Sequence, residues 1–175
     1  MNEETDQVEG EVDPSDAELD GVAGMDHRYM TFELDHQFYG IELASVQEIV
    51  RAQRATQVPD VPSFVRGVIN LRGTVVPVVD VRRRMGMEPI DTDERTCVIV
   101  CSFRGEGIGL VVDSVCDVVQ VTEEEIIESS SGHTEGGGND EMIRGLVRQD
   151  DGVKILLNLD EVLADLGELE SATAA

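Results

Sequence analysis

Apolar residues in this chain recur in short runs, a pattern typical of β-strands rather than of long helices. The clearest stretch runs from Gly67 to Asp80, where two runs rich in β-branched residues flank Arg72-Gly73. Glycine supplies the positive φ that a tight hairpin turn requires. The stretch therefore predicts a buried β-hairpin with a charged tip. Because Pro77 cannot donate to a strand ladder, we expect its strand to lie at a sheet edge or to carry a bulge.

Further runs of this kind predict strands on both sides of the hairpin, at 29–34, 38–43, 96–103, 108–112, 142–147 and 153–159. Residues 44–50 fit a helical turn and a bent strand equally well. Short helices are expected at 81–85, which Gly86 ends, and at 159–166. Thr122 and Glu125 have the spacing of a helix capping box.

A repeat links the two halves of the chain. Residues 39–50 align without a gap with residues 108–119, and both copies keep a glycine followed by aliphatic positions, then Ser-Val, then an acid before two aliphatics. The hairpin that opens with Arg66-Gly67 corresponds in the same way to the one that opens with Arg144-Gly145. We therefore expect a duplicated, mainly β fold of two small barrels, at about 39–90 and 96–160.

Charge changes the picture of the surface. The chain has 37 acidic and 13 basic residues, a formal charge of −24, and a single lysine, Lys154. Acid enrichment with few lysines is the surface chemistry of proteins from very salty cytoplasm, where ions screen the self-repulsion. The same charge, with no tryptophan and few other aromatics, argues against nucleic acid as a partner.

Three segments are expected to lie outside the packed fold. Residues 1–26 hold ten acids and no Lys or Arg, which predicts a disordered acidic tail, with a docking arm as the alternative. Residues 129–140 are rich in Ser and Gly and predict a mobile loop, and 167–175 predict a flexible C-terminus. The acidic N-terminus is unlike a signal peptide and no apolar run would span a bilayer, so we expect a cytoplasmic protein without membrane insertion.

Candidate catalytic chemistry is sparse. The three cysteines and three histidines lack metal-ligand spacing, and the motifs of zinc proteases, serine hydrolases and phosphate loops are absent. We therefore expect no catalytic, metal or cofactor site. Between Arg51 and Arg84 there are seven arginines and two acids. This zone either faces an acidic partner or neutralises the protein's own carboxylates, and the sequence leaves both interpretations open.

Three segments together carry a resemblance to a known family: residues 38–49, the run from Pro62 to Asp80, and residues 109–115. They resemble the CheW family of chemotaxis coupling proteins, over about 28–166. The resemblance implies a CheW-like domain at 27–166 with two intertwined five-stranded barrels like those of SH3 domains. It also implies a non-enzymatic adaptor in the cytoplasm, which links the cytoplasmic tips of methyl-accepting chemoreceptors to the regulatory domain of the histidine kinase CheA.

The resemblance further implies a receptor-binding groove between the barrels, in which Arg72 makes an ionic contact with an acidic receptor hairpin. The residues carried over to this groove by motif are Val46, Glu48, Gly67, Arg72, Val115 and Val118. Two alternatives stay open at this point: a β-barrel that senses a small molecule, and a detached regulatory domain of the CheA type. The acidic segment and residues 129–140 lie outside the matching motifs.

Overall fold

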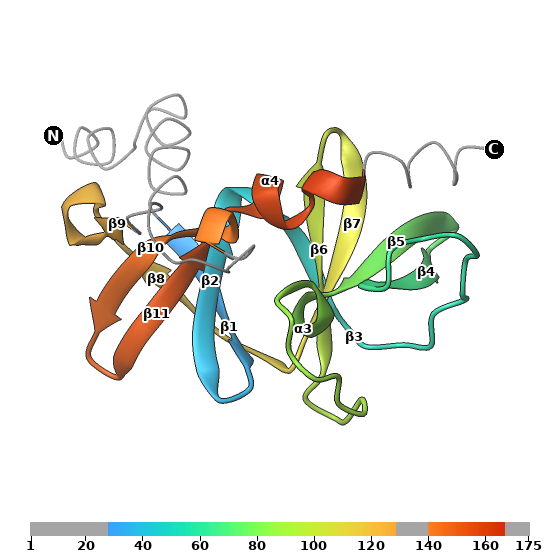
Figure 1. Ribbon diagram of the computed structural model, residues 1–175, viewed down its shortest axis with the longest axis horizontal. Helices are drawn as coiled ribbons and strands as arrows, with labels where there is room; N and C mark the ends of the chain where they lie inside the picture. The colour runs from blue at the N-terminus through green and yellow to red at the C-terminus, as the bar shows by residue number, and fades with distance from the viewer. Residues whose placement is uncertain (1–27, 129–139, 167–175) are drawn as a thin grey trace, which may run out of the picture.

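The computed structural model describes residues 28–128 and 140–166 of the chain. The predicted acidic tail, most of the predicted loop at 129–140, and the predicted flexible C-terminus lie outside these residues. The described part is mainly β and forms two lobes placed side by side (Figure 1).

Eleven strands and a few short helical segments make up the described residues. The strands are β1 (Arg28–Leu34), β2 (Gln37–Glu42), β3 (Val46–Arg51), β4 (Val65–Leu71), β5 (Thr74–Asp80), β6 (Cys97–Phe103), β7 (Glu106–Val112), β8 (Ser114–Gln120), β9 (Ile127–Glu128), β10 (Ile143–Gln149) and β11 (Gly152–Leu157). The α-helices are α3 (Val81–Arg84) and α4 (Leu159–Val162), and 3-10 turns occupy Leu43–Ser45, Glu123–Glu125, Asp140–Met142 and Ala164–Leu166.

The strands form two sheets that exchange parts between the halves of the chain. Sheet A has the order β8-β1-β2-β11-β10-β9, and sheet B has the order β3-β6-β7-β5-β4. In each sheet an antiparallel hairpin from one half, β1–β2 or β6–β7, lies between strands of the other half. In sheet A, β2 of this hairpin pairs in parallel with β11. In sheet B, β7 of the hairpin pairs in parallel with β5. Each sheet therefore takes strands from both of the ranges 39–90 and 96–160, which is the intertwining implied by the family resemblance.

The exchange arises where the chain crosses from one lobe to the other. After β2 the chain passes through the turn Leu43–Ser45 into β3, and after β7 it passes through Asp113 into β8. These two crossings occupy equivalent positions in the two aligned repeats. Residues 44–50 are thus a helical turn followed by a strand, which combines the two alternatives that the sequence left open.

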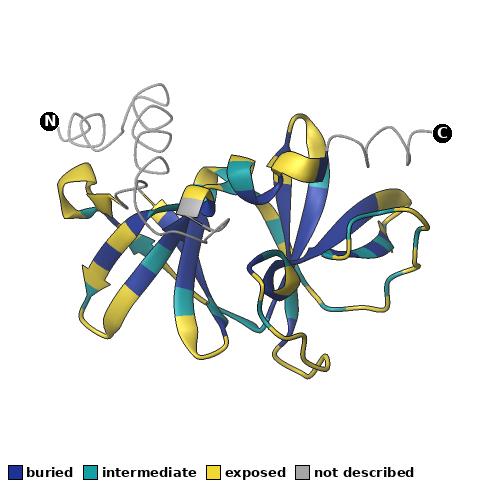
Figure 2. Ribbon diagram, in the orientation of Figure 1, coloured by how far each residue is buried: buried dark blue, intermediate teal, exposed yellow. Residues whose placement is uncertain are grey.

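Three apolar clusters show why the lobes stay together. One lies within sheet B and includes Val76 and Val98, and another lies within sheet A and includes Tyr29 and Leu156. The largest contains residues of both sheets, such as Phe32 of β1 and Leu110 of β7, and we call it the shared core. Buried residues meet where the lobes join (Figure 2). Because β1 and β7 bury both of their faces, neither lobe can open without exposing apolar surface.

Sheet B curls until its two edge strands meet. Although β3 and β4 are at opposite ends of the strand order, Arg72 at the tip of the β4–β5 hairpin forms an ion pair with Glu48 of β3. Farther along, Thr56 bridges Val68 of β4. The sheet therefore closes as a small barrel, which removes the exposed edges that would invite unwanted strand pairing.

The local turn and cap predictions are confirmed. Arg72 and Gly73 both have positive φ, at 51° and 89°, and the Asn70 side chain accepts a hydrogen bond from the Gly73 amide at 2.9 Å. Thr122 and Glu125 form the predicted capping box. The expectation for Pro77 is wrong, because β5 lies between β4 and β7 and the bulge is in β4. Pro77 lacks a backbone N–H, but this costs no hydrogen bond with β7, because the pairing of β5 with β7 begins only at Val78.

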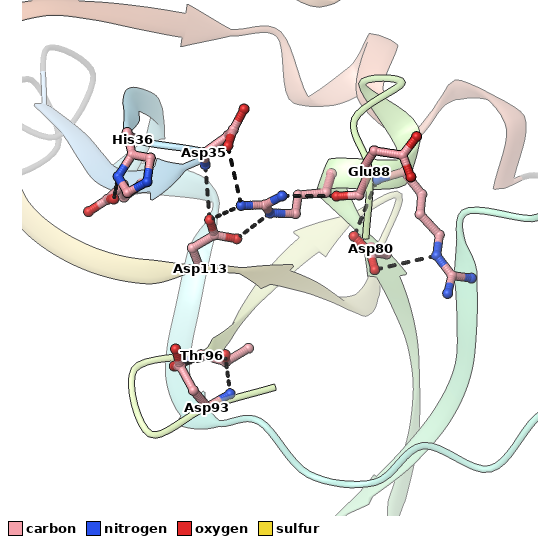
Figure 3. A network of polar contacts seen from close by, with 10 residues as sticks. Asp35, His36, Asp80, Glu88, Asp93, Thr96 and Asp113 are labelled. Carbon is pink, nitrogen blue, oxygen red and sulfur yellow. Dashed lines mark hydrogen bonds and ion pairs between the residues drawn. The ribbon is translucent and has the colours of Figure 1, made fainter. Parts of the chain in front are cut away.

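A buried ion pair joins the lobes. Arg82 of α3 donates to both carboxylate oxygens of Asp113, at 2.7 and 2.6 Å, and to the carbonyl of Glu88 at 2.9 Å. Asp113 also accepts a hydrogen bond from the Asp35 amide in the β1–β2 turn, at 2.9 Å (Figure 3). Since α3 follows sheet B and the turn belongs to sheet A, this network fixes the position of one lobe against the other.

Candidate functional site

The six residues predicted to bind a partner lie on three strands and one hairpin tip. Glu48 and Arg72 contact each other directly, and the ion pair is on the surface because the Arg72 side chain is 72% exposed. Arg72 can reach outward because the tight turn holds its backbone in the left-handed region, with the tip beyond the sheet. The hydrogen bond with the Glu48 carboxylate raises the pKa of Arg72, so the guanidinium stays charged.

Two valines of the set occupy equivalent places in the two repeats. Val46 begins β3, Val115 lies near the start of β8, and both are half-buried against the shared core. Val118 of β8 is exposed, at 45%. Ile49 of β3 is the equivalent of Val118 in the alignment of the repeats, and it is also exposed, at 39%. Sequence reasoning missed Ile49 as a surface residue, although the alignment of the repeats contained the signal.

Gly67 has a different place from the other five. It is buried, and a Cβ on it would lie 2.1 Å from the Thr56 carbonyl oxygen. Its φ of 140° is also one that side chains rarely adopt. Gly145 is its counterpart in sheet A, where a Cβ would meet the Ile127 carbonyl at 2.7 Å. Gly67 therefore allows the returning chain to pack on β4, and it contributes to a surface only through the shape of the backbone.

The hollows of the described surface lie away from these six residues. One of about 680 Å³ is beside the base of the β4–β5 hairpin, and another of about 410 Å³ is beside Arg144 and Asn158. Neither is lined by any of the six. The structure thus brings together Glu48 and Arg72 and sets Val46 and Val115 against one core, but it does not enclose the six in a pocket.

Groups able to do covalent or metal chemistry are poorly placed. Burial raises the pKa of the Cys101 thiol to about 12, whereas a nucleophilic cysteine needs a lowered pKa. Cys97 and Cys101 share one face of β6 and pack on the shared core. Among the residues that the structure describes, no group of three or more His, Cys, Asp or Glu could hold a metal ion. None of the helices in 28–128 and 140–166 has the length and hydropathy to cross a bilayer.

The arginine zone between Arg51 and Arg84 serves the fold in part. Five of its seven arginines form ion pairs with carboxylates of the chain itself: Arg66 and Arg83 with Asp80, Arg72 with Glu48, Arg82 with Asp113, and Arg84 with Asp165. For these five, neutralisation of the protein's own groups is confirmed. The side chains of Arg51 and Arg54 are exposed and make no hydrogen bond or ion pair within the described residues.

Comparison with known proteins gives one consistent result. The family model described as CheW-like domain matches residues 28–167. The chemotaxis protein CheW of Bacillus subtilis is 31% identical over 136 residues, which cover 78% of this chain and 86% of that protein. The chemotaxis protein CheW of Klebsiella aerogenes is 40% identical over 98 residues, or 56% of this chain. This match spans 59% of the Klebsiella protein, and a match to the probable chemotaxis protein CheW of Rhizobium etli spans 64% of that protein. Each match thus spans less than two thirds of the relative's own length.

A solved structure shares the fold. The crystal structure of the scaffolding protein TtCheW from Thermoanaerobacter tengcongensis superposes with a TM-score of 0.70 at 28% identity, covering 79% of this chain and 93% of that one. The predicted mainly β fold of two SH3-like barrels is therefore confirmed.

Proposed function

This chain belongs to the CheW family, and we propose that it acts as a non-enzymatic chemotaxis adaptor that couples chemoreceptor cytoplasmic tips to the histidine kinase CheA. The observation that carries the proposal is the pair of barrels locked around one shared core, which holds two surfaces at a set distance. An adaptor needs such a fixed arrangement, because partner state is relayed through relative placement. The raised pKa of the buried Cys101 thiol agrees with a role without catalysis.

We place the receptor contact at Val46, Glu48, Arg72, Val115 and Val118, with Gly67 shaping the backbone beneath. The Glu48–Arg72 pair supplies an exposed charge held at one position, and Ile49 and Val118 supply exposed apolar area beside β3 and β8. A guanidinium suits bidentate recognition of a carboxylate on an acidic receptor hairpin. Transmission to CheA then depends on the buried Arg82–Asp113 pair, which sets how the lobes lie against each other.

Capture of CheA and of a receptor cytoplasmic fragment by the purified chain tests this proposal. Arg72→Glu is expected to weaken receptor capture at least about tenfold, because it places two like charges together and removes the cation. CheA capture should change little. A charge swap, Arg72→Glu with Glu48→Arg, separates the ion pair from the position of the cation: it preserves the pair but should not restore receptor binding.

Arg104→Glu is the matched control, since Arg104 is exposed in the tight β6–β7 turn and has a positive φ of 53°, close to the 51° of Arg72. Receptor capture that is equal for Arg72→Glu and Arg104→Glu would remove Arg72 from the contact. Failure to capture either partner, at low salt and at about 1 M salt, would overturn the adaptor role itself.

The two alternative functions are not favoured. A small-molecule sensor needs a cavity in a barrel, but the described interiors are filled by Val76, Val98 and their neighbours in sheet B and by Tyr29 and Leu156 in sheet A. A detached CheA regulatory domain is less well supported, since the relatives reported above carry the name CheW. We place the protein in the cytoplasm, at receptor arrays.

Salt adaptation is a further part of the proposal. With a charge of −24, the chain repels itself in dilute buffer, and ions at molar concentration shorten the reach of that repulsion to about 3 Å. We therefore expect the thermal unfolding midpoint to rise by about 10 °C or more between about 0.05 M and 2 M KCl. Scanning calorimetry at several salt concentrations measures this rise. A midpoint that is flat over the whole range would contradict salt adaptation.

A further inference from the structure

The hollow of about 680 Å³ gathers positive charge from three separate elements. Arg54 comes from the segment after β3, Arg66 from β4, and Arg83 from α3, whereas a single acid, Asp91, lines the hollow. Beneath them lie Val65, Val78 and Val111. We call this hollow the arginine groove.

Internal contacts leave positive charge in the groove unmatched. Arg66 and Arg83 share one buried carboxylate, that of Asp80, at 2.9 and 3.6 Å. Their remaining contacts are neutral: Arg66 donates to the Thr92 hydroxyl at 3.4 Å, and Arg83 donates to the Ser63 carbonyl at 3.2 Å. Arg54 is exposed and has no polar partner within the described residues. A guanidinium in that position can still bind a carboxylate in bidentate fashion.

The chain carries its own polyanion. Residues 1–26 hold ten acids with no Lys or Arg, and only His27 separates them from β1. For 26 residues, the random-coil root-mean-square extent is roughly 28 Å and the fully extended length is about 85 Å. Tethering at such a length gives an effective concentration in the millimolar range, so contacts that are weak individually suffice.

We propose that the acidic segment 1–26 docks on the arginine groove and leaves it when the salt concentration is high. At about 0.15 M salt the Debye length is about 8 Å, so the segment responds to the nearby arginines rather than to the net negative charge of the whole molecule. At 1 M the length falls to about 3 Å, and only direct contacts act. The docked state is thus favoured in dilute solution and lost in brine.

The groove is separate from the proposed receptor contact. It lies at the base of the β4–β5 hairpin, beside Val65 and Val78, whereas Arg72 is at the hairpin tip. Docking of the segment therefore leaves Glu48 and Arg72 uncovered. The inference is independent of the adaptor role, and an acidic surface of another protein would compete with the segment for the groove.

Paramagnetic relaxation in the full chain tests the docking. Lys154 is 1% exposed, so the α-amino group, which also has the lower pKa, takes an amine-reactive spin label selectively. At about 0.05 M salt, the label should broaden the amide signals of groove residues such as Ala55, Ser63 and Thr92. Arg54→Gln should reduce this broadening at least about threefold, and about 1 M salt should abolish it.

Two further variants decide between docking and general attraction. Arg148→Gln removes one exposed arginine from sheet A and should leave the broadening at the groove unchanged. A variant with four acids of the segment neutralised should reduce the broadening at the groove as much as Arg54→Gln does. Its substitutions are Asp13→Asn, Asp16→Asn, Glu18→Gln and Asp20→Asn. No broadening at the groove, or an equal response to Arg54→Gln and Arg148→Gln, would overturn the proposal.

Discussion

Arg82→Ala is expected to lower the free energy of unfolding by about 3–5 kcal/mol, the cost of leaving a buried carboxylate without its partner. The Arg82 and Asp113 side chains are only 10% and 13% exposed, and the two hydrogen bonds between them are short and parallel. Truncation also leaves the Glu88 carbonyl without its donor. Denaturant unfolding measures the loss.

Arg72→Ala is the matched control, because it removes an arginine from an ion pair on the surface. Exposed pairs of that kind contribute about 0–1 kcal/mol. If Arg82→Ala cost no more than Arg72→Ala, the pair between the lobes would not be a stabilising element. The double variant Arg82→Ala with Asp113→Ala should cost less than the two single losses added together, since no buried charge is then left alone.

The acid response of the same pair has a definite sign. Desolvation raises the pKa of Asp113, but the hydrogen bonds from Arg82 and from the Asp35 amide outweigh it, so the pKa in the folded protein is lowered. A lowered pKa contributes stability above the unfolded value of about 3.9, and this stability is lost as the pH falls through the folded value. The difference in unfolding free energy between wild type and Arg82→Ala should therefore narrow below about pH 4.

Gly67→Ala is expected to destabilise the fold by about 3 kcal/mol or more. The new Cβ would lie 2.1 Å from the Thr56 oxygen and 2.7 Å from its carbonyl carbon. Backbone atoms cannot move aside as the end of a flexible side chain can, so the bridge between Thr56 and Val68 has to shift. Unfolding in denaturant measures the cost.

Gly152→Ala separates the crowding from the backbone strain. Gly152 has a φ of 134°, close to the 140° of Gly67, but a Cβ on it would have no neighbouring atom within 4 Å. Its substitution should cost only the strain of the backbone conformation, about 1–3 kcal/mol. Equal losses at Gly67 and Gly152 would show that the close approach of Thr56 is relieved without cost.

Local features were predictable because a few neighbouring residues determine them. The turn at Arg72-Gly73 follows from the conformational freedom of glycine, and the capping box follows from the spacing of Thr122 and Glu125. The repeat and the family resemblance were also readable, since both depend on the order of residues. For the site, the sequence predicted Glu48 and Arg72, which the structure places in contact.

Lys154 shows what side-chain type alone could not reveal. It is the single lysine and is buried, with its ammonium 2.9 Å from an Asp151 carboxylate oxygen and 4.0 Å from the centre of the Phe38 ring. Lysine is almost always exposed, so the sequence argues for the surface. The pairing of β11 with both β10 and β2 places Lys154 inside sheet A, where Asp151 and the ring compensate its charge.

What the sequence by itself determined is most of the strands, the hairpin turn, the capping box, the duplication and the family, whereas β8 and β9 were not predicted as strands. What only the tertiary structure decided is which hairpin completes which sheet, and with it the junction where Arg82 meets Asp113. The physical reason is that the two repeats present nearly the same apolar alternation, so a hairpin such as β1–β2 fits either half. Pairing across the lobes is selected by the shared core, which forms only when residues from both halves pack together.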